Sequence, residues 1–245
     1  MANRPFDQVW KTLEQEIGSG VFSEDLLHGL PSVAQRYLRH AIAPKTPLAA
    51  SLRFTMHGSI KVGPWLRFSA REVIAPRRGF VWKARVAWGL LSAEDHYLDG
   101  EGATIVSLFG LVTLLNAGGP DVSMSARGRL LGESVFVPSA FLAADVAWEE
   151  VDTNKVRAAV ALDGEECSTT LTVDDSGCLR EVVVPRWGNQ TPDRMYSVIP
   201  FGVAMNAEGS FSGFTIPCDF TASWWHGTDR RQEFFRARIE PKEFR

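Results

Sequence analysis

Three polar residues with helical spacing stand out in the middle of the sequence. Ser125, Arg129 and Glu133 follow one another at four-residue steps, so in a helix they lie on one face. An Arg and a carboxylate on a buried face have to be paired, with each other or with strand residues, because an unpaired buried charge is too unfavourable. This predicts either a structural ion pair or a site in which a carboxylate base acts beside a cationic stabiliser.

A second candidate group is the tripeptide Asp95-His96-Tyr97. Neighbouring side chains on a strand point to opposite faces, so Asp95 and Tyr97 share a face that His96 does not. An Asp–His dyad is therefore disfavoured. If the shared face points inward, Asp95 or Tyr97 can pair with Arg129 or bind a ligand, and we favour an ion pair that ties sheet to helix.

Two aromatic clusters, Arg186-Trp187-Gly188 and Trp224-Trp225-His226-Gly227-Thr228, each end a predicted strand. An Arg beside Trp can be a cation over an indole ring, a carboxylate clamp at a pocket mouth, or a surface side chain lying across apolar area, and the last is the commonest. His226 is the only histidine in an aromatic cluster. It is a candidate general base, although a structural histidine is the favoured interpretation.

Composition excludes several classes of function. The formal net charge of the 245 residues is −3 with both signs interspersed, which disfavours a nucleic-acid surface or a polybasic membrane anchor. The first twenty residues are charged throughout, so we expect neither a signal peptide nor an integral membrane segment, and a cytoplasmic protein.

The motifs of common cofactor and metal sites are missing from the sequence. It contains no dinucleotide, P-loop, zinc-protease or nucleophile-elbow signature, so we expect no cofactor. Cys167, Cys178 and Cys218 have no CxxC spacing, and the five histidines are not paired at metal-ligand spacing. We therefore predict no metal site, and a site assembled from distant segments has only a low prior probability.

Strands are the main elements that position these residues. Between Ala49 and Phe109 apolar and polar residues alternate, most clearly where Phe80, Trp82, Ala84, Val86 and Trp88 share one face. Further strands are predicted after the central helix, at 145–152, 155–163, 166–174, 178–187, 205–214, 216–225 and 230–239.

The predicted fold class is α+β. A large curved antiparallel sheet of about ten strands, a half-barrel or open barrel, wraps around one central helix at 121–137, which Gly118, Gly119 and Pro120 precede and Pro138 ends. Two N-terminal helices are expected at 5–18 and 23–40. Residues 1–44 then form a helical segment packed on a single sheet domain at 45–245.

The order of several sequence blocks resembles a bacterial family of unknown function, from about Leu30 to Phe235. The blocks are Leu30-Pro31 with Arg36-Tyr37-Leu38, Gly79 to Ala84, Asp95-His96-Tyr97 with Gly100 and Gly102, the set Ser125, Arg129, Glu133 and Pro138, Arg186-Trp187-Gly188, Pro200-Phe201-Gly202, Thr215-Ile216-Pro217, and Trp224 to Thr228. His226 departs from the family, where the residue after the Trp pair is usually aromatic. The predicted fold is similar to lipoprotein-carrier half-barrels that shelter acyl chains, an analogy that does not fix function.

The leading functional hypothesis is the binding of a hydrophobic or lipid-like small molecule in an apolar cavity between sheet and central helix. The candidate ligand-binding residues are Trp82, Trp88, Tyr97, Arg129, Arg186, Trp187, Trp224 and Trp225. The alternative is a cofactor-independent isomerase, cyclase or hydrolase of an apolar substrate, with Glu133, Asp95 or His226 as candidate catalytic residues and Arg129 as stabiliser. A third alternative, a partner-binding module, predicts a filled interior and an exposed patch around Trp224 and Trp225. The oligomeric state stays open.

Overall fold

The structure is a computed structural model that describes residues 5–245. Within them, thirteen strands form one antiparallel sheet in the order β6-β5-β4-β3-β2-β1-β13-β12-β11-β10-β9-β8-β7. The strands are β1 (Leu52–Lys61), β2 (Trp65–Ala75), β3 (Gly79–Val86), β4 (Leu91–Leu98), β5 (Glu101–Leu108), β6 (Val112–Gly118), β7 (Ala147–Asp152), β8 (Lys155–Leu162), β9 (Glu165–Val173), β10 (Leu179–Gly188), β11 (Ser197–Phe211), β12 (Phe214–Trp224) and β13 (Gln232–Phe244). Pairing of β1 with β13 joins the two meanders into one sheet.

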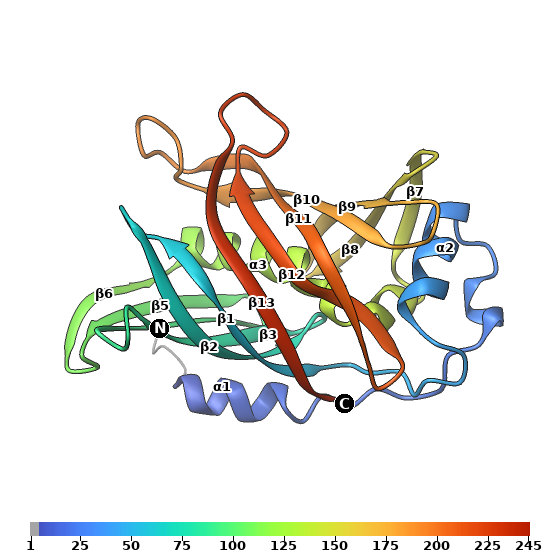
Figure 1. The fold of residues 1–245 in the computed structure, drawn as a ribbon, viewed down its shortest axis with the longest axis horizontal. Coiled ribbons are helices and arrows are strands. Elements are labelled where there is room, and N and C mark those ends of the chain that lie inside the picture. The colour runs from blue at the N-terminus through green and yellow to red at the C-terminus, as the bar shows by residue number, and fades with distance from the viewer. Residues whose placement is uncertain (1–4) are drawn as a thin grey trace.

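The helices are α1 (Phe6–Leu13), α2 (Ser32–Ala41) and α3 (Pro120–Glu133), with short 3₁₀ turns η1 (Glu24–Leu27), η2 (Ser134–Phe136) and η3 (Pro138–Leu142). Helix α3 connects the two edge strands, and its main contacts are with β10 on one half of the sheet and β5 on the other. The sheet curves around it (Figure 1). Gly119, with φ +92°, and Pro120 at the first helical position set the start of α3.

The two faces of the sheet carry separate cores. Strand β3 shows the principle, because Phe80 and Trp82 point inward to the large core around α3, whereas Val81 packs outward against Val9 and Leu13 of α1. Period-two alternation thus buries both faces of the middle strands. Helix α2 lies at the other end of the sheet, against β12 and β7–β9.

The predicted antiparallel open sheet with a central helix is confirmed, but the strand count of about ten was too low. The sequence prediction omitted β6, whose side chains are mostly exposed, so it lacks the alternation that marks a half-buried strand. The central helix ends at Glu133 rather than at 137, and its last residues continue as a 3₁₀ turn.

The N-terminal helices are present but shorter than predicted. Helix α1 ends at Leu13, and the second predicted helix is divided into η1 and α2 because Gly29, with φ +81°, and Pro31 interrupt it. Residues 1–4 of the expected N-terminal segment lie outside the described residues, and the division at residue 44 stays a prediction. In the part of the chain that is described, no helix is long and apolar enough to cross a bilayer.

Candidate functional site

Arg129 of α3 is the centre of a buried ionic network. Its Nη1 lies 2.8 Å from Asp95 Oδ2 of β4, and its Nε lies 2.8 Å from Glu133 Oε1 one turn later. Its Nη2 lies 3.2 Å from both carboxylate oxygens of Glu72 on β2. The Glu72 side chain is fully buried and the Arg129 side chain is 14% exposed. The predicted pairing of Arg129 with Glu133 and with a strand residue is therefore confirmed.

The network has three carboxylates for one guanidinium, and this excess of negative charge shifts the pKa of Glu72. Burial raises the pKa of Glu72 well above its usual value, and the nearby Glu133 charge raises it further, against the opposing effect of Arg129. A protonated Glu72 can donate to Glu133, whose Oε2 is buried with no other partner among the described residues. Burial lowers the pKa of Arg129, but the Glu133, Glu72 and Asp95 charges outweigh it, and the net shift is upward.

Sequence reasoning missed Glu72, although a signal was available. In β2 the residues Phe68, Ala70, Glu72 and Ile74 alternate toward the inner core, so a carboxylate at position 72 had to point inward and find a partner. The guanidinium it meets also lies over an aromatic ring, since Arg129 Cζ is 4.3 Å from the centre of the Phe80 ring. The network fixes α3 against β2, β3 and β4.

Tyr97 points into the inner core and is almost fully buried, but its hydroxyl does not pair with Arg129. Its hydroxyl donates to Asp163 in the turn between β8 and β9, so it links the two halves of the sheet. Burial raises the pKa of Tyr97 above its usual value, and the hydrogen bond to Asp163 adds to the effect.

Arg186 of β10 is a partly buried cation without a carboxylate partner among residues 5–245. Its Nε donates to Ser125 O at 3.0 Å, and its Cζ lies 4.7 Å from the Phe201 ring centre and 4.9 Å from that of Trp224. Burial lowers the pKa of Arg186 to about 10, and the Arg129 charge adds to this shift. It remains charged at neutral pH and is held as a cation between aromatic rings.

Gly128 provides the space for Arg186. A Cβ at Gly128 would lie 2.7 Å from Arg186 Cγ, closer than real side chains approach. The close neighbour at Gly128 is thus a side chain, whereas Gly132 has only ordinary contacts, with Val184 Cγ2 at 3.6 Å.

His226 is hydrogen-bonded at both ring nitrogens. Nε2 lies 2.5 Å from Glu181 Oε1, and Nδ1 lies 2.8 Å from Ser223 Oγ. The ring packs on Gly202, where a Cβ would lie 2.1 Å from His226 Cγ. Ser223 is fully buried, so this Ser–His–Glu chain gives a substrate no access to the serine. The geometry agrees with a structural histidine that fastens the turn after β12.

Trp82 and Trp88 do not share a face. Trp82 is buried in the inner core. Strand β3 ends at Val86, and Ala87 and Trp88 turn with φ values of +51° and +57°. Trp88 is 93% exposed, so its predicted place on the inner face was wrong.

The other three tryptophans predicted to bind a ligand lie around the ends of β10 and β12. Trp187 Nε1 donates to Asp121 Oδ1 at 2.8 Å, so Asp121 binds this indole, and α3 has no side-chain N-cap. Trp225 Nε1 donates to Gln190 O at 2.6 Å. Trp224 is buried beside Arg186.

The interior beside α3 is largely filled, whereas a groove opens at one end of the sheet. The pocket against Leu131 and Ser134 holds about 20 Å³, room for roughly one water molecule. The larger one, of about 600 Å³, we name the rim groove. It is lined by Lys61, Trp65, Gln190, Trp224, Arg231, Gln232, Glu233, Phe234 and Arg236.

The rim groove joins an aromatic floor to a cationic border. Trp65, Trp224 and Phe234 supply the rings. The border contains Lys61, Arg231 and Arg236 against a single acid, Glu233, which pairs with Arg236 at 2.5 Å and Arg231 at 3.7 Å. Of the predicted ligand-binding residues only Trp224 lines this groove.

Comparison with solved structures finds similar chains at low sequence identity. A LolA superfamily protein from Nitrosomonas europaea, NE2245, has a TM-score of 0.45 and 6% identity over 86% of this chain and 90% of its own. A domain described as an outer membrane lipoprotein-sorting protein from Vibrio parahaemolyticus has a TM-score of 0.41 and 8% identity, over 80% and 85%. A DUF1329 family protein from Desulfovibrio piger has a TM-score of 0.34 and 10% identity, over 78% and 84%.

All three TM-scores are below 0.5. No curated protein matches this chain by sequence. The profile of one family, described as a family of unknown function, matches residues 28–244. The expected membership in a family of unknown function is thereby confirmed, and the chain belongs to the DUF6920 family.

Proposed function

We propose that the protein binds a small hydrophobic molecule with an acidic group in the rim groove. The main observation in support of the proposal is that one groove of about 600 Å³ has both an aromatic floor and a cationic border. Pockets for small ligands typically have volumes of about 300 to 1,000 Å³ and are lined by apolar and aromatic groups with a few polar ones. The groove meets both criteria.

The positive charge of the rim groove favours ligands that carry an acidic group. Lys61, Arg231 and Arg236 exceed the acids of the groove by two charges, although the whole chain is acidic, with a net charge of −3. Arg186 lies behind the floor, over the Trp224 ring, and adds positive potential there. A carboxylate or phosphate group on an apolar chain fits this pattern, and a neutral molecule does not use it.

The enzyme alternative has no comparable support. Asp95 and Glu133 are ion-paired with Arg129, His226 is hydrogen-bonded at both nitrogens, and none of them lines the rim groove. The groove itself contains one carboxylate, Glu233, which is paired with arginines. The proposal is therefore binding without catalysis.

Calorimetric titration with a long-chain fatty acid and with the alcohol of equal chain length tests this proposal. We expect the acid to bind about tenfold more tightly, equivalent to about 1.4 kcal/mol from the cationic border. Lys61→Gln should reduce that preference, whereas Lys11→Gln on α1, outside the groove, should not.

Trp65→Ala and Trp88→Ala form a matched pair for the aromatic floor. Trp65 lines the groove and is 37% exposed, whereas Trp88 is 93% exposed and lies outside it. Loss of Trp65 should weaken binding roughly five- to tenfold, as for an aromatic contact worth more than about 1 kcal/mol, and loss of Trp88 should have no effect. Equal effects of the two substitutions, or no binding of either ligand, would refute the proposal.

A further inference from the structure

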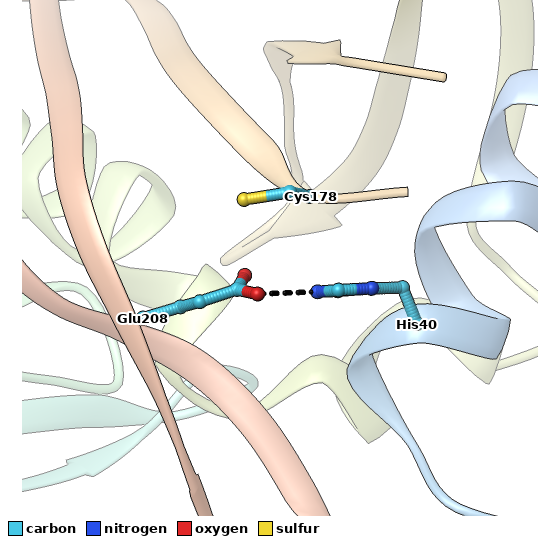
Figure 2. Close-up of side chains that lie close together, drawn as sticks. All are labelled: His40, Cys178 and Glu208. Carbon is cyan, nitrogen blue, oxygen red and sulfur yellow. Dashed lines mark hydrogen bonds and ion pairs between the residues drawn. The ribbon is translucent and has the colours of Figure 1, made fainter. Parts of the chain in front are cut away.

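We propose that His40, Cys178 and Glu208 form a binding site for a zinc-type divalent cation, separate from the rim groove. Figure 2 shows His40, in the last turn of α2, and Glu208, on β11, pointing toward each other, with the side chain of Cys178, the residue before β10, beside them. Their ligand atoms all lie within 4.8 Å of one another, and His40 Nε2 is 2.8 Å from Glu208 Oε1. His40 and Glu208 are 168 positions apart, so no sequence spacing indicates the site.

Contacts outside the cluster hold its members in place. Arg36 of α2 donates from Nε to Asp174 O at 2.9 Å, and Asp174 Oδ1 in turn accepts from Cys178 N at 3.1 Å. Gly177 has φ +90°, and a Cβ there would lie 2.6 Å from His40 Cβ. Only glycine allows this turn to lie directly against α2, which places Cys178 beside His40.

The donor set suits zinc. Thiolate, imidazole and carboxylate are its usual ligands, at about 2.0 to 2.3 Å from the metal. In a tetrahedral zinc site two donor atoms are about 3.3 to 3.8 Å apart. The ligand atoms here lie between 2.8 Å and at most 4.8 Å from one another, so side-chain shifts of about 1 Å complete the geometry. A carboxylate with one thiolate and one imidazole disfavours magnesium and calcium, which prefer oxygen ligands alone.

The site has three protein ligands and is open to solvent on one side. The side chains of His40 and Glu208 are 26% and 32% exposed, respectively, whereas Cys178 is buried. Three protein ligands with an open fourth position are typical of a zinc ion that keeps an exchangeable water. The metal would also fasten α2 to the sheet at the end of β10 and β11.

Metal titration of the full chain, freed of metal by chelation and of any purification tag, tests the inference. Zn²⁺ should bind at about one ion per chain, and Co²⁺ should give a thiolate-to-metal charge-transfer band. Cys178→Ser should abolish the band and weaken Zn²⁺ binding by more than about a hundredfold, whereas Cys167→Ser, a partly exposed cysteine on β9, should change neither. At a hundredfold excess over Kd, Zn²⁺ should raise the Tm by about 5 to 10 °C.

Two further variants, His40→Gln and Glu208→Gln, test the site even if Cys178→Ser does not fold. Each should weaken Zn²⁺ binding while leaving the Tm of the metal-free protein within a few degrees. Unchanged affinity in all three ligand variants, or Co²⁺ binding without a thiolate band, would overturn the inference and leave only a His40–Glu208 ion pair beside a buried thiol.

Discussion

Replacing Arg129 by Met tests whether the buried network holds α3 in the sheet. The guanidinium contacts Glu72, Asp95 and Glu133 within 3.2 Å, and Met keeps much of the apolar volume while removing the charge. Removing one partner of a buried ion pair typically costs about 3 to 5 kcal/mol. Since whole domains are stable by about 5 to 15 kcal/mol, we expect a large loss from this single change.

Urea unfolding followed by tryptophan fluorescence measures the effect. With a denaturant slope of about 3 kcal/mol per molar, a loss of 3 to 5 kcal/mol lowers the unfolding midpoint by about 1 to 2 M. Arg127→Met is the matched control, because Arg127 lies on the same helix, is partly buried, and has no carboxylate contact among those described for the network. It should cost less than about 1 kcal/mol.

Additional substitutions show whether Arg129→Met destabilises the protein by removing favourable contacts or by leaving carboxylates buried without a partner. If Arg129→Met destabilises because Asp95 and Glu133 are left unpaired, adding Asp95→Asn and Glu133→Gln should restore more than half of the lost stability. Equal midpoints for Arg129→Met and Arg127→Met would refute the claim that the network is architectural.

Two further predictions concern the neighbours of Arg129. The folded state raises the pKa of Glu72, so its contribution to stability is fully present below the unfolded value near 4.5 and is lost as pH rises through the folded pKa. Urea unfolding between pH 5 and 8 should therefore show that the free energy of unfolding of Glu72→Gln, relative to the wild type, rises by up to about 1.4 kcal/mol per pH unit. The same pH dependence of unfolding in both proteins would contradict this. Gly128→Ala should destabilise by about 1 to 3 kcal/mol because its Cβ meets Arg186. Gly132→Ala, at a position with ordinary contacts, should stabilise the protein by up to about 1 kcal/mol, because alanine has the higher helix propensity. A higher Tm for Gly128→Ala than for Gly132→Ala would exclude the steric explanation.

Alternation in the sequence was sufficient to predict most strands and the inner face of β3, because burying one side of a strand requires period two. It also predicted that Asp95 and Tyr97 lie on one face of their strand. It failed at Trp88, where the pattern continues but the chain turns after Val86. It failed at β6 for the opposite reason, since an edge strand with exposed faces needs no alternation.

Local sequence patterns could not predict which residues from distant strands contact one another across the sheet. The need of Arg129 for a carboxylate follows from burial alone, but the choice of Glu72 depends on the register of β2 against β3 and β4. The rim groove likewise combines Lys61 and Trp65 of the β1–β2 hairpin with residues 231–234 and 236. These segments meet only because β1 pairs with β13, a contact between the first and last strands.

The free energy needed to displace α3 favours a ligand site in the rim groove over one between α3 and the sheet. Displacing α3 would break the Arg129 network, at about 3 to 5 kcal/mol, and expose Leu130 and Leu131, which are now buried, at about 1.5 to 3 kcal/mol each. The sum, about 6 to 11 kcal/mol, would cancel most or all of the roughly 8 kcal/mol that a micromolar ligand gains. A ligand in the rim groove avoids this loss because Trp224 and Phe234 are reached with α3 in place. Arg129→Met, studied where it remains folded, should therefore keep the fatty-acid affinity of the wild type, and a weakened affinity would place the ligand against α3 instead.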